Sequence, residues 1–187
     1  MNKDQIIIVT AIKLFVDNGF HGTATSKIAQ ESGVANGTLF NYFATKEILI
    51  ISIYNSIVKK MDDFIIESLE SNSVSKESFR SLFVASLKWN LENPIEFKYL
   101  QQFNNSPYSK SVITSVFRQD EHPLYVLIQN AIDLVIIKPF PAAFIFSLFT
   151  AQINGLYNYL VSTDINENKR TELINETFEL LWKMIED

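Results

Sequence analysis

Apolar residues recur with the period of an α-helix along most of this chain. In the first segment Ile8, Ala11 and Phe15 stand at i, i+3 and i+7, so a helix there would bury one stripe and end near Gly19. Polar or proline-containing breaks separate further predicted helices over residues 47–70, 76–92, 94–104, 109–116, 120–137, 142–162 and 167–185. This pattern predicts an all-α protein.

The stretch from residue 25 to residue 49 has the pattern of two short helices joined by a tight turn. Gly33 stands where the first helix must stop, at a position where a positive φ favours glycine. In the second helix Leu39 and Phe43 are four residues apart on the inner face. Two short helices around a glycine-containing turn are typical of the helix-turn-helix, which places its second helix in the major groove of DNA.

The same stretch closely resembles the signature of the TetR (tetracycline-repressor-like) family of bacterial transcriptional regulators. The matching residues are Ile28-Ala29, Ser32-Gly33-Val34, Gly37-Thr38-Leu39-Phe40, Tyr42-Phe43 and Lys46-Glu47-Ile48-Leu49. The resemblance covers about residues 3–50, and the remainder matches only in size and helical character. It implies a three-helix DNA-binding domain at 1–47 and a helical domain for ligand binding and dimerisation at 48–187.

The motif also supplies the candidate DNA contacts. These are Thr25, Ala35, Asn36, Gly37, Thr38, Phe40, Asn41, Tyr42 and Lys46. Thr25 and Lys46 are expected at phosphates, and in the family the positions of Thr38 and Tyr42 often have the same role. Each also has a structural alternative: Thr25 and Asn36 suit helix N-caps, and Lys46 suits a solvated surface position.

Base readout is expected from small and amide side chains. Asn36 and Asn41 can pair with adenine, Ala35 can touch a thymine methyl, and Gly37 permits close approach. No arginine occurs in the first 79 residues, which predicts an A·T-leaning site. The chain departs from the family at Ala35, where serine is usual, and at Phe40, where tyrosine is usual.

Charge is divided unevenly between the two predicted domains. The net charge is −5, yet residues 1–60 hold six lysines against four acidic residues. The remaining residues hold ten basic and seventeen acidic side chains. The small basic excess therefore coincides with the helix-turn-helix, although an excess of two charges does not by itself indicate a nucleic-acid partner.

Other functional classes find little support in the composition. The chain has no cysteine and only two histidines, His21 and His122, and no catalytic or phosphate-binding motif. We therefore predict no enzymatic activity, no metal and no cofactor. The apolar part of residues 139–161 is too short for a membrane span, and no signal peptide is apparent, which together favour the cytoplasm. The remaining alternative is a helical ligand-binding or partner-binding protein without DNA function.

A homodimer is expected, because one short helix gives too little contact for specificity and twofold symmetry suits a pseudo-palindromic operator. The last two helices are the predicted interface, as in the family. The candidate residues are Phe144, Leu148, Ala151, Gly155 and Tyr159, with Phe178, Leu181, Trp182 and Ile185. The alternative is that these stripes are buried within one chain.

The second domain is dense in aromatic residues, which form either a core or a ligand pocket. The candidate ligand-binding residues are Trp89, Phe97, Phe103, Phe117, Tyr125, Phe149, Gln152 and Tyr157. The polar groups of such a pocket could come from the amide side chains of Asn90, Gln101, Gln102, Gln129, Gln152 and Asn154. Because basic residues are few here, a neutral or cationic lipophilic effector is expected. The resemblance then implies a transcriptional regulator that such an effector releases from DNA. A repressor is expected, because that is the usual role in the family.

Overall fold

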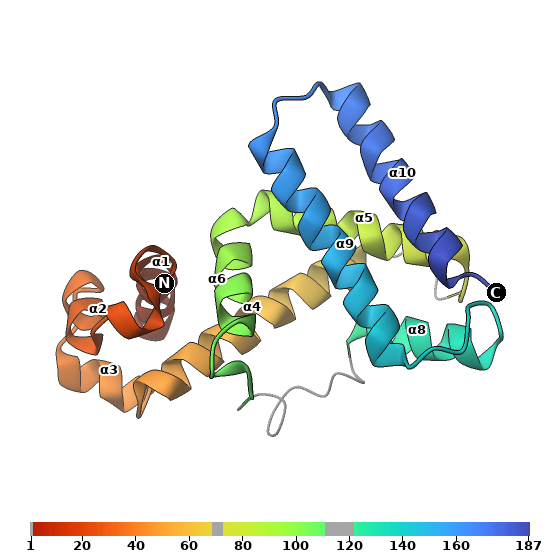
Figure 1. Cartoon of the computed structure of the whole chain (residues 1–187). Helices are drawn as coiled ribbons and strands as arrows, with labels where there is room; N and C mark the ends of the chain where they lie inside the picture. Colours follow the sequence, from red (N-terminus) through yellow and green to blue (C-terminus); the bar gives the residue numbers. More distant parts are fainter. Residues whose placement is uncertain (1, 69–72, 111–121) are drawn as a thin grey trace. The chain divides into compact units, whose positions relative to one another are not determined.

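The computed structural model of the chain describes residues 2–68, 73–110 and 122–187 (Figure 1). Within these ranges the regular structure is helical, apart from one isolated antiparallel bridge between Ile137 and Glu186. The helices are α1 (Lys3–Gly22), α2 (Thr25–Glu31), α3 (Asn36–Tyr42), α4 (Lys46–Glu67), α5 (Lys76–Glu92), α6 (Pro94–Asn104), α8 (Pro123–Asp133), α9 (Ala142–Ser162) and α10 (Glu167–Ile185). The predicted all-α class is confirmed.

The predicted helix over residues 120–137 is too long at its C-terminal end. Helix α8 stops at Asp133, and the residues that follow are paired with the end of α10 instead. The Lys138 amide donates to the Ile185 carbonyl at 2.7 Å, and the Asp187 amide to the Ile136 carbonyl at 3.5 Å. A partner distant in sequence thus takes the backbone bonds that a longer helix would have made. The predicted helix over 109–116 lies outside the described residues from 111 onward.

Contacts divide the chain into two compact units. The first consists of Met1–Lys60 with Asn93–Phe117, and the second of Met61–Glu92 with Arg118–Asp187. Helix α6 therefore belongs with α1, α2, α3 and the first part of α4. The boundary predicted after residue 47 separates a DNA-binding from a ligand-binding domain. It concerns function and not contacts, and it stays a prediction.

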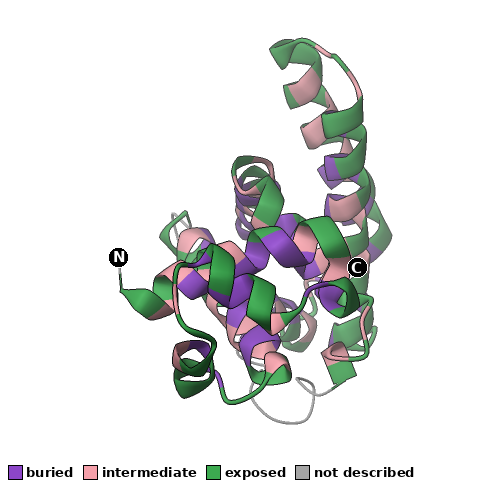
Figure 2. Cartoon of the chain, turned by 90° about the vertical axis from the view of Figure 1, so that its left-hand side faces the viewer, coloured by how far each residue is buried: buried purple, intermediate pink, exposed green. Residues whose placement is uncertain are grey.

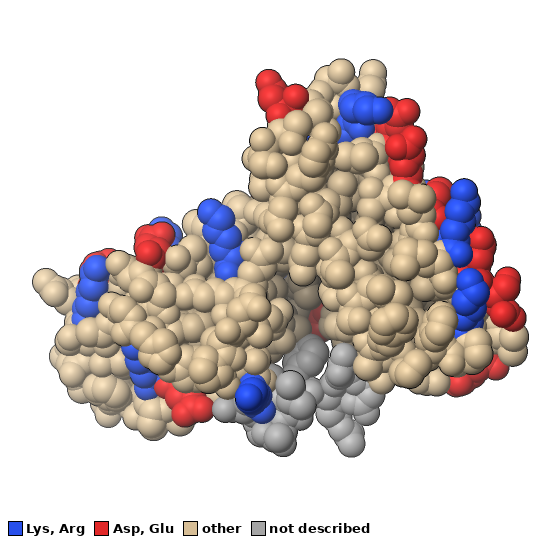
Figure 3. Space-filling model, in the orientation of Figure 1, with Lys and Arg blue, Asp and Glu red and all other residues tan. Residues whose placement is uncertain are grey.

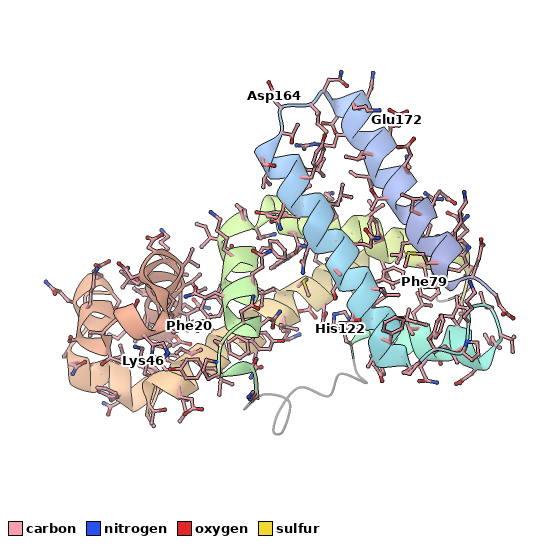
Figure 4. The ribbon with its side chains drawn as sticks, in the orientation of Figure 1. Phe20, Lys46, Phe79, His122, Asp164 and Glu172 are labelled. Atoms are coloured by element: carbon pink, nitrogen blue, oxygen red, sulfur yellow. The ribbon has the colours of Figure 1, made fainter. Side chains whose placement is uncertain are left out.

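The first unit is held by an aromatic core between α1, α4 and α6. Phe20, labelled in Figure 4, lies edge-on to Tyr99 of α6, with 5.4 Å between ring centroids. Tyr54 of α4 stacks on Phe103 with 4.1 Å between centroids. The buried Tyr99 hydroxyl donates to the Ile50 carbonyl at 2.8 Å. Its hydrogen bond lets the phenol stay in an apolar core, because a buried hydroxyl without a partner is costly.

Helix α1 changes direction at Gly19, which has φ 76° and ψ 162°. The fully buried Thr23 hydroxyl lies 2.8 Å from the Gly19 carbonyl and 3.0 Å from that of Leu14. It therefore satisfies carbonyls that the break in the helix leaves open. The chain is then directed into α2.

The second unit is formed by the end of α4 with α5, α8, α9 and α10, and α9 contacts α5, α8 and α10. Phe79 of α5 contacts Phe149 of α9 at 5.6 Å and Trp182 of α10 at 5.4 Å between centroids. Figure 2 shows buried and exposed residues alternating along the helices, as expected when each helix buries one face.

Candidate nucleic-acid interface

Helices α2 and α3 are joined by a tight turn that is shaped by a glycine and by hydrogen bonds to backbone carbonyls. Gly33 has φ 69°, as predicted. The Val34 amide donates to the Ala29 carbonyl at 3.0 Å, and the Ser32 hydroxyl donates to the Ile28 carbonyl at 2.7 Å. These bonds satisfy the carbonyls at the end of α2, so the turn remains tight.

The predicted capping roles of Thr25 and Asn36 are wrong. Ala24 and Ala35 occupy the two N-cap positions, and neither makes a side-chain cap. Thr25 and Asn36 are instead the first helical residues. Because a side-chain cap is formed from the residue before the helix, both side chains are free of that role.

Helix α3 has a buried and an exposed face. Leu39 is fully buried and Phe43 nearly so, as predicted for its inner anchors. The exposed residues are Asn36, Gly37, Phe40, Asn41 and Tyr42, and Thr38 is half-buried. The exposed positions therefore include most of the predicted DNA contacts of this helix, on a surface free to meet a partner.

Neither the backbone angle nor the packing at residue 37 requires a glycine. The φ of Gly37 is not positive, and a Cβ added there would meet no atom within 4 Å. Glycine is nevertheless less favourable than alanine inside a helix by about 1 kcal/mol. The absence of a side chain therefore creates open space on the exposed face of α3.

Lys46 begins α4, just after α3 (Figure 4). Partial burial lowers the pKa of its ammonium group. The Thr45 hydroxyl accepts the Ile48 amide at 3.1 Å, which caps this helix. By contrast, the nearby Lys27 on α2 faces Glu31 at 3.9 Å, so its charge is partly compensated.

Comparison with known proteins gives the same assignment. Residues 7–53 match the family described as "Bacterial regulatory proteins, tetR family". The chain is 34% identical over 75 residues to the "Fatty acid metabolism regulator protein" of Bacillus subtilis (strain 168), which is 40% of this chain and 39% of that protein. The chain thus matches about two fifths of that relative's length.

Solved structures extend the similarity to the whole chain. A protein from Shewanella sp. PV-4, assigned to the tetR family of transcription regulators, superposes with a TM-score of 0.89 at 28% identity, covering 100% of both chains. Through residues 7–53 and its fold, this chain belongs with the TetR family. A TetR family regulator from Marinobacter aquaeolei VT8 shares the fold with a TM-score of 0.80 at 20% identity, covering 99% of this chain and 96% of that one.

The predicted effector residues of this chain are divided between the two units. Phe97 and Phe103 are buried in the first, and Trp89, Phe149 and Tyr157 are buried in the second. Tyr125 and Gln152 are half-buried in the second unit as well, and Phe117 lies outside the described residues. The seven described residues are thus shared between two units, five in the second and two in the first.

Asn90 and His122 are buried polar residues of the second unit. Asn90 is 4% exposed, and its Oδ1 has no hydrogen-bond partner among the residues that the structure describes. His122 is the N-cap of α8: its Nδ1 accepts the Leu124 amide at 3.2 Å, so Nε2 carries the proton and faces Asp62 at 3.4 Å (Figure 4). Burial lowers the pKa of His122 to about 4, so the imidazole is neutral near pH 7.

The predicted interface residues of α10 match the alternative, burial within one chain. Phe178, Leu181, Trp182 and Ile185 are buried, and α10 packs on α5 and α9. By contrast, the α9 stripe lies at the surface: Phe144, Ala151, Gly155 and Tyr159 are exposed and Leu148 is half-buried.

A second stripe on α10 was missed. Leu180 and Met184 are 62% and 49% exposed, and they continue the helical spacing of Leu173 and Thr177. Only burial distinguishes the two stripes, because α10 carries apolar residues on both sides.

No described helix is long and apolar enough to cross a membrane. Among the residues in the described ranges, no three His, Asp or Glu side chains are grouped so as to hold a metal ion.

Replacing Gly37 with alanine should separate stability from DNA binding. We expect the Gly37→Ala variant to be as stable as the wild type or up to about 1 kcal/mol more stable in urea titrations, because glycine is the poorer helix former. Its affinity for duplex DNA should fall, because the new methyl group occupies the approach surface. Equal affinity in fluorescence anisotropy titrations would show that nothing approaches Gly37 closely.

His122 should make the stability of the fold depend on pH. Its pKa is about 4 in the folded state, below the value of about 6.5 in an unfolded chain. The unfolded state therefore binds the proton first as the pH falls from 6.5 to 4, and the fold should lose about 1–3 kcal/mol over that window. Above pH 6.5 the effect is absent. The His122→Asn variant, which keeps a capping side chain, should lose less, as measured by urea unfolding at several pH values. The exposed His21→Asn change is the control and should behave as wild type.

Proposed function

We propose that this chain is a ligand-responsive repressor that binds a pseudo-palindromic operator as a homodimer and is released by a small lipophilic effector. The observation that carries the proposal is the exposed face of α3, where Asn36, Gly37 and Asn41 lie at the surface and a Cβ added at Gly37 would meet no atom within 4 Å. Amide side chains beside an open backbone suit base edges in a major groove. Thr25, Ala35, Thr38, Tyr42 and Lys46 then complete the contacts to bases and phosphates.

Dimerisation is proposed through the outer face of α9 together with Leu180 and Met184 of α10. Between Lys138 and Asp164 the sequence has no charged residue, although much of α9 is exposed. The surface over α9 accordingly shows neither basic nor acidic side chains in Figure 3. Solvent-facing helices normally carry charge, and a face without it suits a subunit interface.

Gly155 supports the same surface. It is exposed in the middle of α9, its φ is not positive, and an added Cβ would meet no atom within 4 Å. With Ala151 one turn earlier, it leaves a shallow strip on which a partner helix can lie close. The fold itself gives no reason for a glycine there.

The effector is proposed to bind in the second unit, where Trp89, Phe149 and Tyr157 supply apolar surface and Asn90 an unpaired acceptor. Tyr125 and Gln152 are further candidates. Phe97 and Phe103 are not proposed as effector contacts, because they belong to the core of the first unit. A donor-bearing lipophilic molecule would satisfy the Asn90 oxygen, and differential binding of about 1–3 kcal/mol between two states is typical of such coupling.

Selection of bound duplexes from a random DNA pool tests the central proposal. The purified protein should enrich a palindromic site, and the Asn41→Ala, Tyr42→Ala double variant should not, since both side chains are exposed on α3. A Val9→Ala variant, exposed on α1, is the control. No enrichment by the wild type at low salt would favour a helical partner-binding protein, once mass spectrometry of the denatured sample has shown that no effector was carried along.

A glutamate at Ala151 should weaken the dimer without unfolding the subunit. Ala151 is exposed in the single chain, and glutamate is a good helix former, so circular dichroism should be unchanged. Burying the unpaired charge in an interface should weaken association by about a hundredfold or more, measured by sedimentation equilibrium. The Val84→Glu variant, on the exposed side of α5, is the matched control and should remain dimeric. A fully dimeric Ala151→Glu protein would exclude this face as the interface.

A further inference from the structure

Phe40 presents an apolar ring on the exposed face of the recognition helix α3. The side chain is 39% exposed, and it takes part in none of the ring–ring or cation–ring contacts found among the described residues. Leu39 and Phe43 already anchor α3 to the first unit. The Phe40 ring is therefore not needed to hold the helix in place.

The immediate neighbours of Phe40 leave its ring accessible. Asn36 and Gly37 precede it by four and three residues and so lie beside it on the helix surface. Both are exposed, and the Cβ position at Gly37 is empty for 4 Å. A flat group can therefore reach the ring from the Gly37 side without displacing a side chain.

Phenylalanine limits what the ring can recognise. It has no hydroxyl, so it cannot donate a hydrogen bond to a phosphate or accept one from a base. The one apolar group that bases present in the major groove is the C5 methyl of thymine, and a phenyl ring is among the side chains that contact it. Cytosine and uracil lack this methyl.

We propose that Phe40 is a specificity-determining residue that reads one thymine methyl in each half-site. The inference rests on the proposed operator binding and adds a requirement to it. Asn36 and Asn41, on either side of the ring, can pair with adenine edges at the same or a neighbouring step. The exposed face of α3 then combines amides for adenine with one ring for thymine, with no arginine available in this unit's helices α1 to α4 for guanine.

The test replaces thymines in the selected operator, one symmetric pair at a time, with deoxyuridine. This change removes the methyl and leaves base pairing intact. At one position per half-site the wild type should bind about fifteenfold more weakly, since each buried methyl is worth about fourfold. The Phe40→Ala variant should bind the unmodified operator more weakly and should be insensitive to deoxyuridine at that position. A pair of 5-methylcytosine with guanine carries the methyl group but no adenine. It therefore serves as a control for the contribution of the adenine contacts.

The proposal is overturned if no thymine shows methyl dependence with the wild type, or if the dependence persists in Phe40→Ala. The first outcome would mean that the ring lies against sugar or backbone. Val9→Ala, with an exposed apolar residue on α1, should keep the full dependence and controls for general loss of apolar surface. Should the wild type select no site at all, the operator proposal itself fails, and that result is distinct from binding without methyl dependence.

Discussion

The proposed DNA-reading surface of α3 depends on the burial of two side chains, Leu39 and Phe43. Helices α2 and α3 have seven residues each, too short to be stable in water alone. The buried Leu39 and Phe43 side chains hold one face of α3 against the first unit, and α3 contacts both α1 and α2. The exposed positions of α3 are therefore oriented by packing and not by helix propensity, which two alanine N-caps do little to strengthen.

The first unit also includes α6, a helix from much later in the chain. Tyr99 of α6 contacts Phe20 of α1 and donates its hydroxyl to the Ile50 carbonyl of α4. Tyr54 and Phe103 add a stacked pair between α4 and α6. The core of the first unit is thus shared with residues that the sequence motif does not contain, because α6 packs directly on α1 and α4.

In the second unit, one helix carries apolar residues for two purposes. The inner stripe of α10 packs on α5, where Trp182 contacts Phe79 and Phe178 contacts Phe83. Arg80 of α5 lies over the Phe178 ring at 4.6 Å. Arg80 and Lys76 also pair with Glu179, which fixes α10 against α5. The outer stripe remains exposed beside an uncharged α9. Burial within the subunit and the proposed association between subunits therefore use opposite sides of the same helix.

The sequence alone determined the helices, the turn at Gly33 and the inner face of α3, because these follow from local periodicity and from a backbone angle that glycine favours. It also identified the family, through residues at fixed spacings around the turn. Tertiary structure decided which of the two stripes of α10 is buried, where α8 ends, and that Phe97 and Phe103 belong with the DNA-binding unit. Each of these depends on contacts between residues far apart in the chain, such as Lys138 with Ile185 or Tyr99 with Ile50. A one-dimensional pattern shows that a face is apolar, but only packing in three dimensions selects the surface that covers it.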